Sequence, residues 1–135
     1  MYSVTYIEGN GYHCSCCRQA SRYNRKFDTL EQAAEFAARI NFLAEDSSVL
    51  EDLDGFVPDG FDDFHYDNDY ELVQIYHHGK RMLNDPEVQK RIAEWNSKIE
   101  MEVAEARTRV QDMEREERRR QYEILKAEFE EGSSG

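Results

Sequence analysis

The sequence predicts an α+β protein: a small antiparallel sheet with one helix packed on it, followed by a long C-terminal helix. Three observations carry this prediction. Residues 2–8 and 70–78 alternate apolar and polar side chains, as half-buried strands do. Residues 30–44 repeat their apolar side chains at the period of an amphipathic helix. No Gly or Pro occurs between residues 87 and 131.

This pattern divides the chain into a domain and an appended helix. We expect one domain over residues 1–83, which includes an acidic and aromatic loop over residues 45–71, followed by a helix over residues 84–131. The last four residues, 132–135, read GSSG and are expected to be a disordered end or the scar of a tag.

The amino-terminal segment predicts a β-hairpin. Residues 2–8 (YSVTYIE) are rich in β-branched and aromatic residues, and residues 9–11 (GNG) have the composition of a turn. Residues 12–19 (YHCSCCRQ) favour the returning strand. Residues 21–28 are less distinct and form either the end of that strand or a short third one.

An amphipathic helix is predicted after the hairpin. Asp28 or Thr29 is a suitable N-cap, and Glu31 or Gln32 stands three residues further on, as in a capping box. The stripe expected to face the sheet comprises Leu30, Ala33, Ala34, Ala37, Ile40 and either Leu43 or Ala44. After the acidic segment, residues 70–78 predict a further antiparallel strand.

A second helix is predicted from residue 86 to about residue 131. Asn84 or Asp85 supplies the N-cap, and Pro86 suits the first helical position, where its missing N–H costs nothing. A helix of about 45 residues is roughly 68 Å long, which exceeds what a small domain can bury.

The apolar stripe of this helix requires a partner. Its residues follow steps of three and four, close to an eleven-residue repeat, until the polar run 114–121 interrupts them. The helix either packs back on its own domain or pairs with a second copy, and we expect a homodimer with a coiled-coil-like interface. The residues assigned to this dimerisation are Val88, Ile92, Trp95, Ile99, Val103 and Val110.

The negative charge of the chain is concentrated in one segment. The net charge is −12, and residues 40–79 alone hold eleven Asp and Glu but no Lys or Arg. A protein that binds nucleic acid carries Lys and Arg residues that contact the phosphates. A segment rich in Asp and Glu and without Lys or Arg therefore argues against direct binding of DNA or RNA. It favours a basic protein as the partner.

Residues 50–72 (LEDLDGFVPDGFDDFHYDNDYEL) permit three interpretations. A solvated linker explains the acids but not the rings, which favour packing over the core with the carboxylates held outward. A calcium site is disfavoured because no EF-hand spacing fits the segment. The third interpretation is a surface that occupies the groove of a nucleic-acid-binding protein, with carboxylates in place of phosphates.

In composition alone, this segment resembles the small acidic nucleic-acid mimics of phages, such as anti-restriction and some anti-CRISPR proteins. We expect a non-enzymatic inhibitor of a basic, nucleic-acid-handling protein or complex, in which dimerisation presents two acidic surfaces. The alternatives are a coiled-coil adaptor for a helical protein partner and a small zinc-binding module. The residues predicted to bind the partner are Glu51, Asp52, Asp54, Asp59, Asp62, Asp63, Asp67 and Asp69, with Phe61 and Phe64 as exposed apolar anchors.

A small group of Cys and His residues has part of the spacing of a metal site. Cys14 and Cys17 have the spacing of zinc ligands, and His77 lies on a strand that can neighbour them, which makes the three weak candidates. Because a zinc site needs a second such pair, small apolar strand residues are the preferred interpretation, and no cofactor is expected.

Other sequence signals bear on enzyme activity and location. No phosphate-binding loop, HExxH or GxSxG motif occurs, which favours a protein without enzymatic activity. The start of the chain is polar and no apolar run reaches the length of a membrane span, so we expect a cytoplasmic protein.

Overall fold

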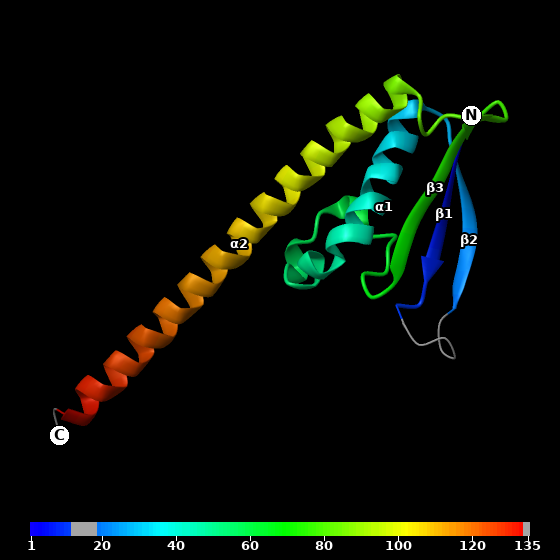
Figure 1. Ribbon diagram of the computed structural model, residues 1–135. Coiled ribbons are helices and arrows are strands. Elements are labelled where there is room, and N and C mark those ends of the chain that lie inside the picture. Colours follow the sequence, from blue (N-terminus) through cyan, green and yellow to red (C-terminus); the bar gives the residue numbers. More distant parts are fainter. Residues whose placement is uncertain (12–18, 134–135) are drawn as a thin grey trace.

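The computed structural model describes residues 1–11 and 19–133, except for the side chains of Asp54 and Ser133. Four antiparallel strands form one sheet in the order β2-β1-β3-β4, accompanied by two helices (Figure 1). The elements are β1 (Tyr2–Gly9), β2 (Ala20–Phe27), α1 (Leu30–Glu51), β3 (Asp69–His77), β4 (Lys80–Arg81) and α2 (Pro86–Ser133). Two short 3-10 helices, η1 (Asp54–Phe56) and η2 (Asp59–Phe61), lie between α1 and β3. The predicted α+β class, with its long second helix, is confirmed.

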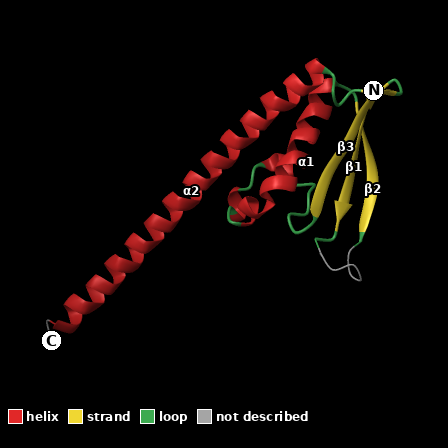
Figure 2. Cartoon of the chain, viewed as in Figure 1, coloured by secondary structure: helices red, strands yellow, loops and turns green. Residues whose placement is uncertain are grey.

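The molecule has three layers, with α1 between the sheet and α2 (Figure 2). Val4 of β1 and Ile75 of β3 are paired across the sheet and fully buried. Ala33, Ala34 and Ala37 of α1 are also fully buried. Small side chains on this face of α1 let the helix approach the sheet closely, so they set the position of the layer above it.

β2 occupies the segment whose assignment the sequence left open. It pairs with β1 along its whole length, from Tyr2 opposite Phe27 to Gly9 opposite Ala20. The returning strand expected over residues 12–19 falls almost entirely outside the described residues. The strand expected at residues 70–78 is confirmed as β3, one residue earlier at each end.

The start of α1 is confirmed by its cap. The side chain of Thr29 accepts from the backbone N–H of Gln32 at 3.2 Å, and the Gln32 side chain accepts from the backbone N–H of Thr29 at 3.4 Å. The helix continues beyond residue 44 to Glu51, with an irregular backbone at Asp46. The expected loop over 45–71 therefore begins as helix, because Leu50 is buried in the core and anchors the extra turns.

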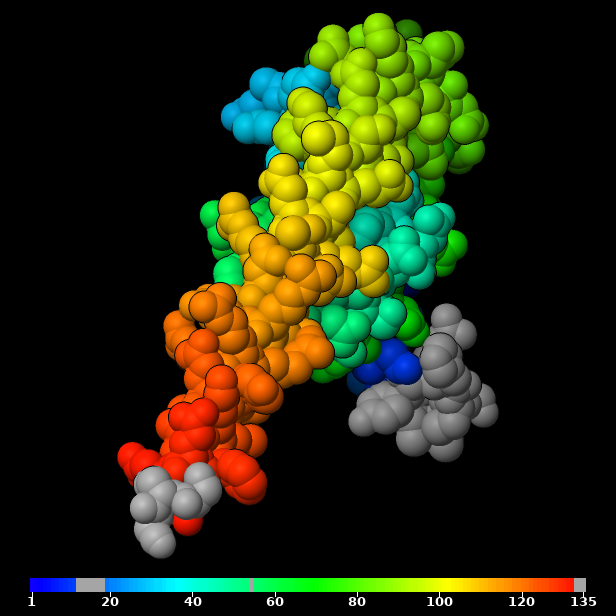
Figure 3. All heavy atoms as spheres, turned by 90° about the vertical axis from the view of Figure 1, so that its left-hand side faces the viewer, coloured from blue at the N-terminus to red at the C-terminus, as the bar shows by residue number. Residues whose placement is uncertain are grey.

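The start of α2 also follows the sequence. The carboxylate of Asp85 accepts from the backbone N–H groups of Glu87 and Val88 at 3.0 and 3.3 Å, as an N-cap does. The amino-terminal half of the helix lies along α1, and its carboxyl-terminal half extends beyond the domain (Figures 1 and 3). We refer to residues 111–133 of α2 as the projecting arm.

The dimerisation residues are corrected by the structure. Val88, Ile92, Ile99 and Val103 are at most 5% exposed within the single chain, because α1 and the η1 segment already cover them. Trp95 and Val110 are half-buried, and the Trp95 indole donates to Glu31 of α1 at 2.7 Å. The stripe thus packs back on its own domain, which was the alternative to pairing with a second copy.

Neither of the long helices described between residues 19 and 133 has a stretch that is long and apolar enough to cross a membrane.

Candidate functional site

The acidic residues of the segment 45–71 form an exposed surface. They come from the end of α1, the two 3-10 helices and the start of β3, which fold together beside the sheet. Ten carboxylate side chains of this segment are described and all ten are exposed: Glu45, Asp46, Glu51, Asp52, Asp59, Asp62, Asp63, Asp67, Asp69 and Glu71. We call these ten residues the acidic surface. The side chain of Asp54 lies outside the described residues.

The aromatic residues of the same segment face inward. Phe61 is fully buried and Tyr70 is 5% exposed. The ring of Phe64 lies between them, with its centroid 6.2 Å from that of Phe61 and 5.6 Å from that of Tyr70. Burial raises the pKa of the Tyr70 hydroxyl, which accepts from the backbone N–H of His65 at 2.9 Å. The expected arrangement, with rings on the core and carboxylates outward, is confirmed.

The proposed apolar anchors are corrected by this arrangement. Phe61 has no exposed surface and Phe64 is half-buried against the core, so Phe61 cannot contact a partner while the segment keeps this fold. Both rings instead fix the backbone that carries the carboxylates. A partner would therefore meet a surface that is mainly charged and has few apolar anchors.

Arg39 of α1 joins the segment 45–71 to α2, a role that was not predicted from the sequence. Its side chain is 6% exposed, and its Nη2 lies 3.1 Å from Glu35 and 3.6 Å from Glu102 of α2. The guanidinium lies 4.8 Å from the ring centroid of Phe61. It also lies against Gly60, where any Cβ would overlap it. Arg39 is the one Lys or Arg in the sequence between residues 27 and 79, a signal that could have revealed its role.

Like charges lie close together on the acidic surface. A hydrogen bond with Asp67 raises the pKa of the Glu51 carboxyl, and the negative charges of Asp67 and Asp52 act in the same direction. Among the described residues, one carboxylate of the surface forms an ion pair, that of Asp63 with Arg25 at 3.4 Å. Since both partners are well exposed, this pair contributes little to stability. The surface therefore keeps a high density of uncompensated negative charge.

Replacement of Glu51 by Gln is expected to raise the melting temperature at neutral pH. The pKa of the Glu51 carboxyl is higher in the folded state than in the unfolded state, so the protonated carboxyl stabilises the fold. This stabilisation is complete below the unfolded pKa of about 4.3, and it is lost as the pH rises through the pKa of the folded state. At neutral pH the Glu51 and Asp67 charges repel each other, whereas an uncharged amide can donate to Asp67. Thermal unfolding between pH 4 and 8 should give a flatter pH dependence for Glu51→Gln. Glu45→Gln removes one charge elsewhere on the acidic surface, and its melting temperature should depend on pH as that of the wild type does. If the melting temperatures of all three proteins depend on pH equally, the interaction between Glu51 and Asp67 is contradicted.

The candidate metal ligands do not come together in the described part of the chain. Cys14 and Cys17 fall outside the described residues. The ring of His77 stacks on Tyr2 with centroids 4.0 Å apart, and its Nδ1 lies 3.1 Å from the Met1 carbonyl oxygen. Within residues 1–11 and 19–133, no group of three or more His, Cys, Asp or Glu is placed to hold a metal ion.

Comparison with protein-family models, with curated proteins and with solved structures found no match to this chain.

Proposed function

We propose that this protein is a non-enzymatic inhibitor that presents the acidic surface to a basic, nucleic-acid-handling protein. The observation that supports this function is the exposure of ten carboxylates over a buried ring cluster. A solvated linker would leave the charges on a mobile chain, and it would not need Phe61, Phe64 and Tyr70 packed beneath them. Fixed carboxylates can instead match the spacing of Lys and Arg in a groove made for phosphates.

The charge distribution favours this partner over a nucleic acid. Carboxylates held close together, as Glu51 and Asp67 are, create a strong negative potential that repels phosphates and attracts cations. Such a field speeds the encounter with a basic surface and makes the complex sensitive to salt. A nucleic-acid mimic of this kind competes with DNA or RNA for one groove, as the anti-restriction and anti-CRISPR proteins of phages do.

Neutralising five carboxylates tests this function. The variant carries Asn at Asp59, Asp62, Asp63, Asp67 and Asp69. The immobilised wild-type protein should retain basic proteins from a nuclease-treated bacterial lysate and release them when duplex DNA or RNA is added. The variant should retain none of them, because the charge that replaces phosphate is gone. Far-UV circular dichroism should show that the variant keeps its fold.

A matched control variant shows whether binding depends on where the negative charges lie or only on how many there are. Changing Glu116, Glu123, Glu128, Glu130 and Glu131 to Gln removes five charges from the projecting arm of α2. Retention should be close to wild type in this protein. Proteins that still bind the Asn variant, or that nucleic acid does not release, would contradict the proposed mimicry.

The projecting arm favours a second candidate function, a helical adaptor. The large apolar side chains that follow Val110 are between 56% and 79% exposed. They include Met113, Tyr122, Leu125 and Phe129. Exposed apolar residues along an otherwise charged helix are typical of a surface that pairs with another helix. That helix would belong to a helical protein partner or to the arm of a second copy, so the homodimer stays a proposal for the arm alone.

A further inference from the structure

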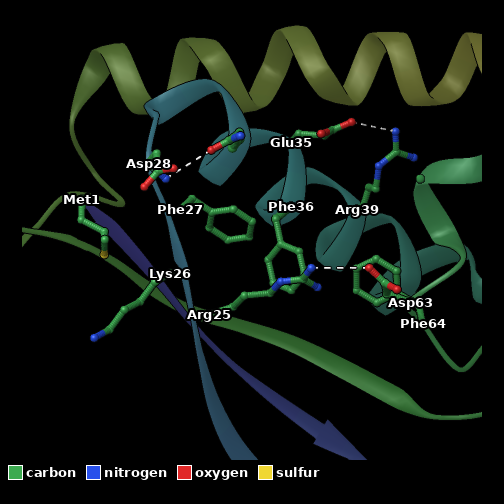
Figure 4. Close-up of a pocket in the computed structure, with 12 residues that line it drawn as sticks. Met1, Arg25, Lys26, Phe27, Asp28, Glu35, Phe36, Arg39, Asp63 and Phe64 are labelled. Atoms are coloured by element: carbon green, nitrogen blue, oxygen red, sulfur yellow. Dashed lines mark hydrogen bonds and ion pairs between the residues drawn. The ribbon is translucent and has the colours of Figure 1, made fainter.

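The open edge of β2 lies beside a cavity. β2 is the terminal strand of the sheet, and β1 is its one strand neighbour among the described residues. The cavity has a volume of about 470 Å³ and is lined by residues of β2, α1 and the segment that begins at Gly60 (Figure 4). Its lining includes the rings of Phe27, Phe36 and Phe64. A strand added at this edge would therefore lie next to an aromatic wall.

Positive charge gathers at the same edge, although the chain has a net charge of −12. Arg22, Arg25 and Lys26 of β2 are exposed, and the buried Arg39 lines the cavity. The Nε and Nη1 atoms of Arg39 have no hydrogen-bond partner among the described residues. Of the three acids in the lining, Glu35 and Asp63 are engaged by Arg39 and Arg25, and Asp28 is exposed just before the N-cap of α1. The remaining hydrogen-bonding capacity of this region thus suits anionic groups.

The side chains of β2 alternate between the two faces of the sheet. The Arg25 guanidinium lies over the rings of Phe27 and Phe36, at 5.6 and 5.1 Å from their centroids, so Arg25 is on the face covered by α1. Figure 4 shows Lys26 pointing away from Phe36. By the two-residue period of a strand, Arg22 shares the open face with Lys26. A complementary strand would turn apolar side chains toward the cavity and acidic ones toward Arg22 and Lys26.

We propose that the β2 edge and its cavity bind an extended acidic segment of a partner protein, which adds to the sheet as a further strand. Backbone hydrogen bonds to the free edge hold the segment, and its alternate apolar side chains enter the cavity. Its carboxylates pair with Arg22 and Lys26 on the open face of the sheet, while Arg25 keeps its ion pair with Asp63 on the face of the cavity. Bases on an edge strand also discourage aggregation, but that role needs no aromatic cavity beside the strand. This surface adjoins the acidic surface at Asp63 and selects a segment of opposite charge.

A synthetic peptide tests the proposal on the full chain. The probe is a fluorescein-labelled Glu-Val-Glu-Phe-Glu-Val-Glu peptide with blocked ends, and binding is followed by fluorescence anisotropy. Saturable binding is expected, whereas the same peptide with Lys in place of Glu should not bind. A third peptide carries N-methyl groups on the amides that would face β2. It keeps the side chains but cannot donate those hydrogen bonds, so its affinity should fall by about tenfold or more.

Two charge-reversed proteins locate the binding site. In Arg22→Glu/Lys26→Glu the affinity for the acidic peptide should fall by about tenfold or more. Lys80→Glu/Arg81→Glu makes the same change in net charge on β4, at the opposite end of the sheet, and should bind as the wild type does. Absence of binding to the wild type, equal binding of the N-methylated peptide, or equal losses in both variants would each overturn the proposal. The N-methylated peptide remains decisive on the wild-type protein even if the β2 variant does not fold.

Discussion

Removal of residues 86–133 is expected to unfold the whole domain, whereas removal of residues 112–133 is expected to leave it folded. The reason lies in the two halves of α2. Val88, Ile92 and Ile99 are at most 4% exposed and belong to the same core as α1 and the sheet. Burial of such a side chain contributes about 1.5–3 kcal/mol, and the first half of α2 supplies several of them. Their combined loss approaches the roughly 5–15 kcal/mol that stabilises a typical domain.

Far-UV circular dichroism and thermal unfolding of the two shortened chains check this expectation. The chain that ends at residue 111 keeps every residue of α2 that is buried, so it should unfold cooperatively close to the wild-type temperature. The chain that ends at residue 85 should show no cooperative transition and should be degraded rapidly by proteases. A stable, cooperatively folded chain of 85 residues would show that α2 is an independent appendage.

The shorter folded chain also separates the two proposed functions. It keeps the acidic surface and loses the projecting arm, so a nucleic-acid mimic should still bind its basic target. A helical adaptor should lose its partner, and a homodimer that depends on the arm should become monomeric in analytical ultracentrifugation. The same chain thus decides between the functions without damage to the core.

Local signals in the sequence predicted the starts of both long helices and the extent of β3. The capping box at Thr29 and Gln32 and the cap at Asp85 are both present, because a cap depends only on residues within one turn of the helix end. The alternation of β3 also appeared in the sequence, since a strand with one buried face shows its period directly. These features need no knowledge of distant contacts.

The partners of those elements were predicted less well. The apolar stripe from Val88 to Val110 shows that one face of α2 packs against another surface. The period of the stripe is the same whether that surface belongs to α1 or to a second copy of the chain. A second copy was predicted because homo-oligomers are the common case, and the first helix was expected to end at residue 44. The longer α1, which runs to Glu51, provides that surface.

The acidic surface shows the same limit. Its carboxylates and the inward direction of its rings could be predicted from composition, because aromatic side chains in an acidic segment favour burial. The role of Phe61 could not, because it depends on Arg39 and Gly60, which come together only in the folded chain. A ring expected to contact a partner proved to be part of the support beneath the charges.

Replacement of Phe61 by Ala is expected to lower the free energy of unfolding by about 3–5 kcal/mol, the usual range for a fully buried Phe. The ring centroid lies 5.6 Å from that of Phe42 and 4.8 Å from the Arg39 guanidinium carbon, so the substitution leaves a cavity between α1 and η2. Urea denaturation measures the loss. Phe129→Ala is the matched control, since Phe129 is 79% exposed, and it should change the stability by less than about 0.5 kcal/mol.

The same pair of variants tests whether the carboxylates must be held rigidly. If Phe61 supports the acidic surface, Phe61→Ala should speed amide hydrogen exchange between residues 59 and 67 under conditions where the rest of the domain stays folded. Binding to a basic target should then weaken although every carboxylate is present, because ordering the segment again costs free energy on binding. A loss of stability below about 1 kcal/mol would contradict the role of Phe61 as a core residue. Unchanged binding by a loosened surface would instead show that the amount of charge, and not its fixed arrangement, determines recognition.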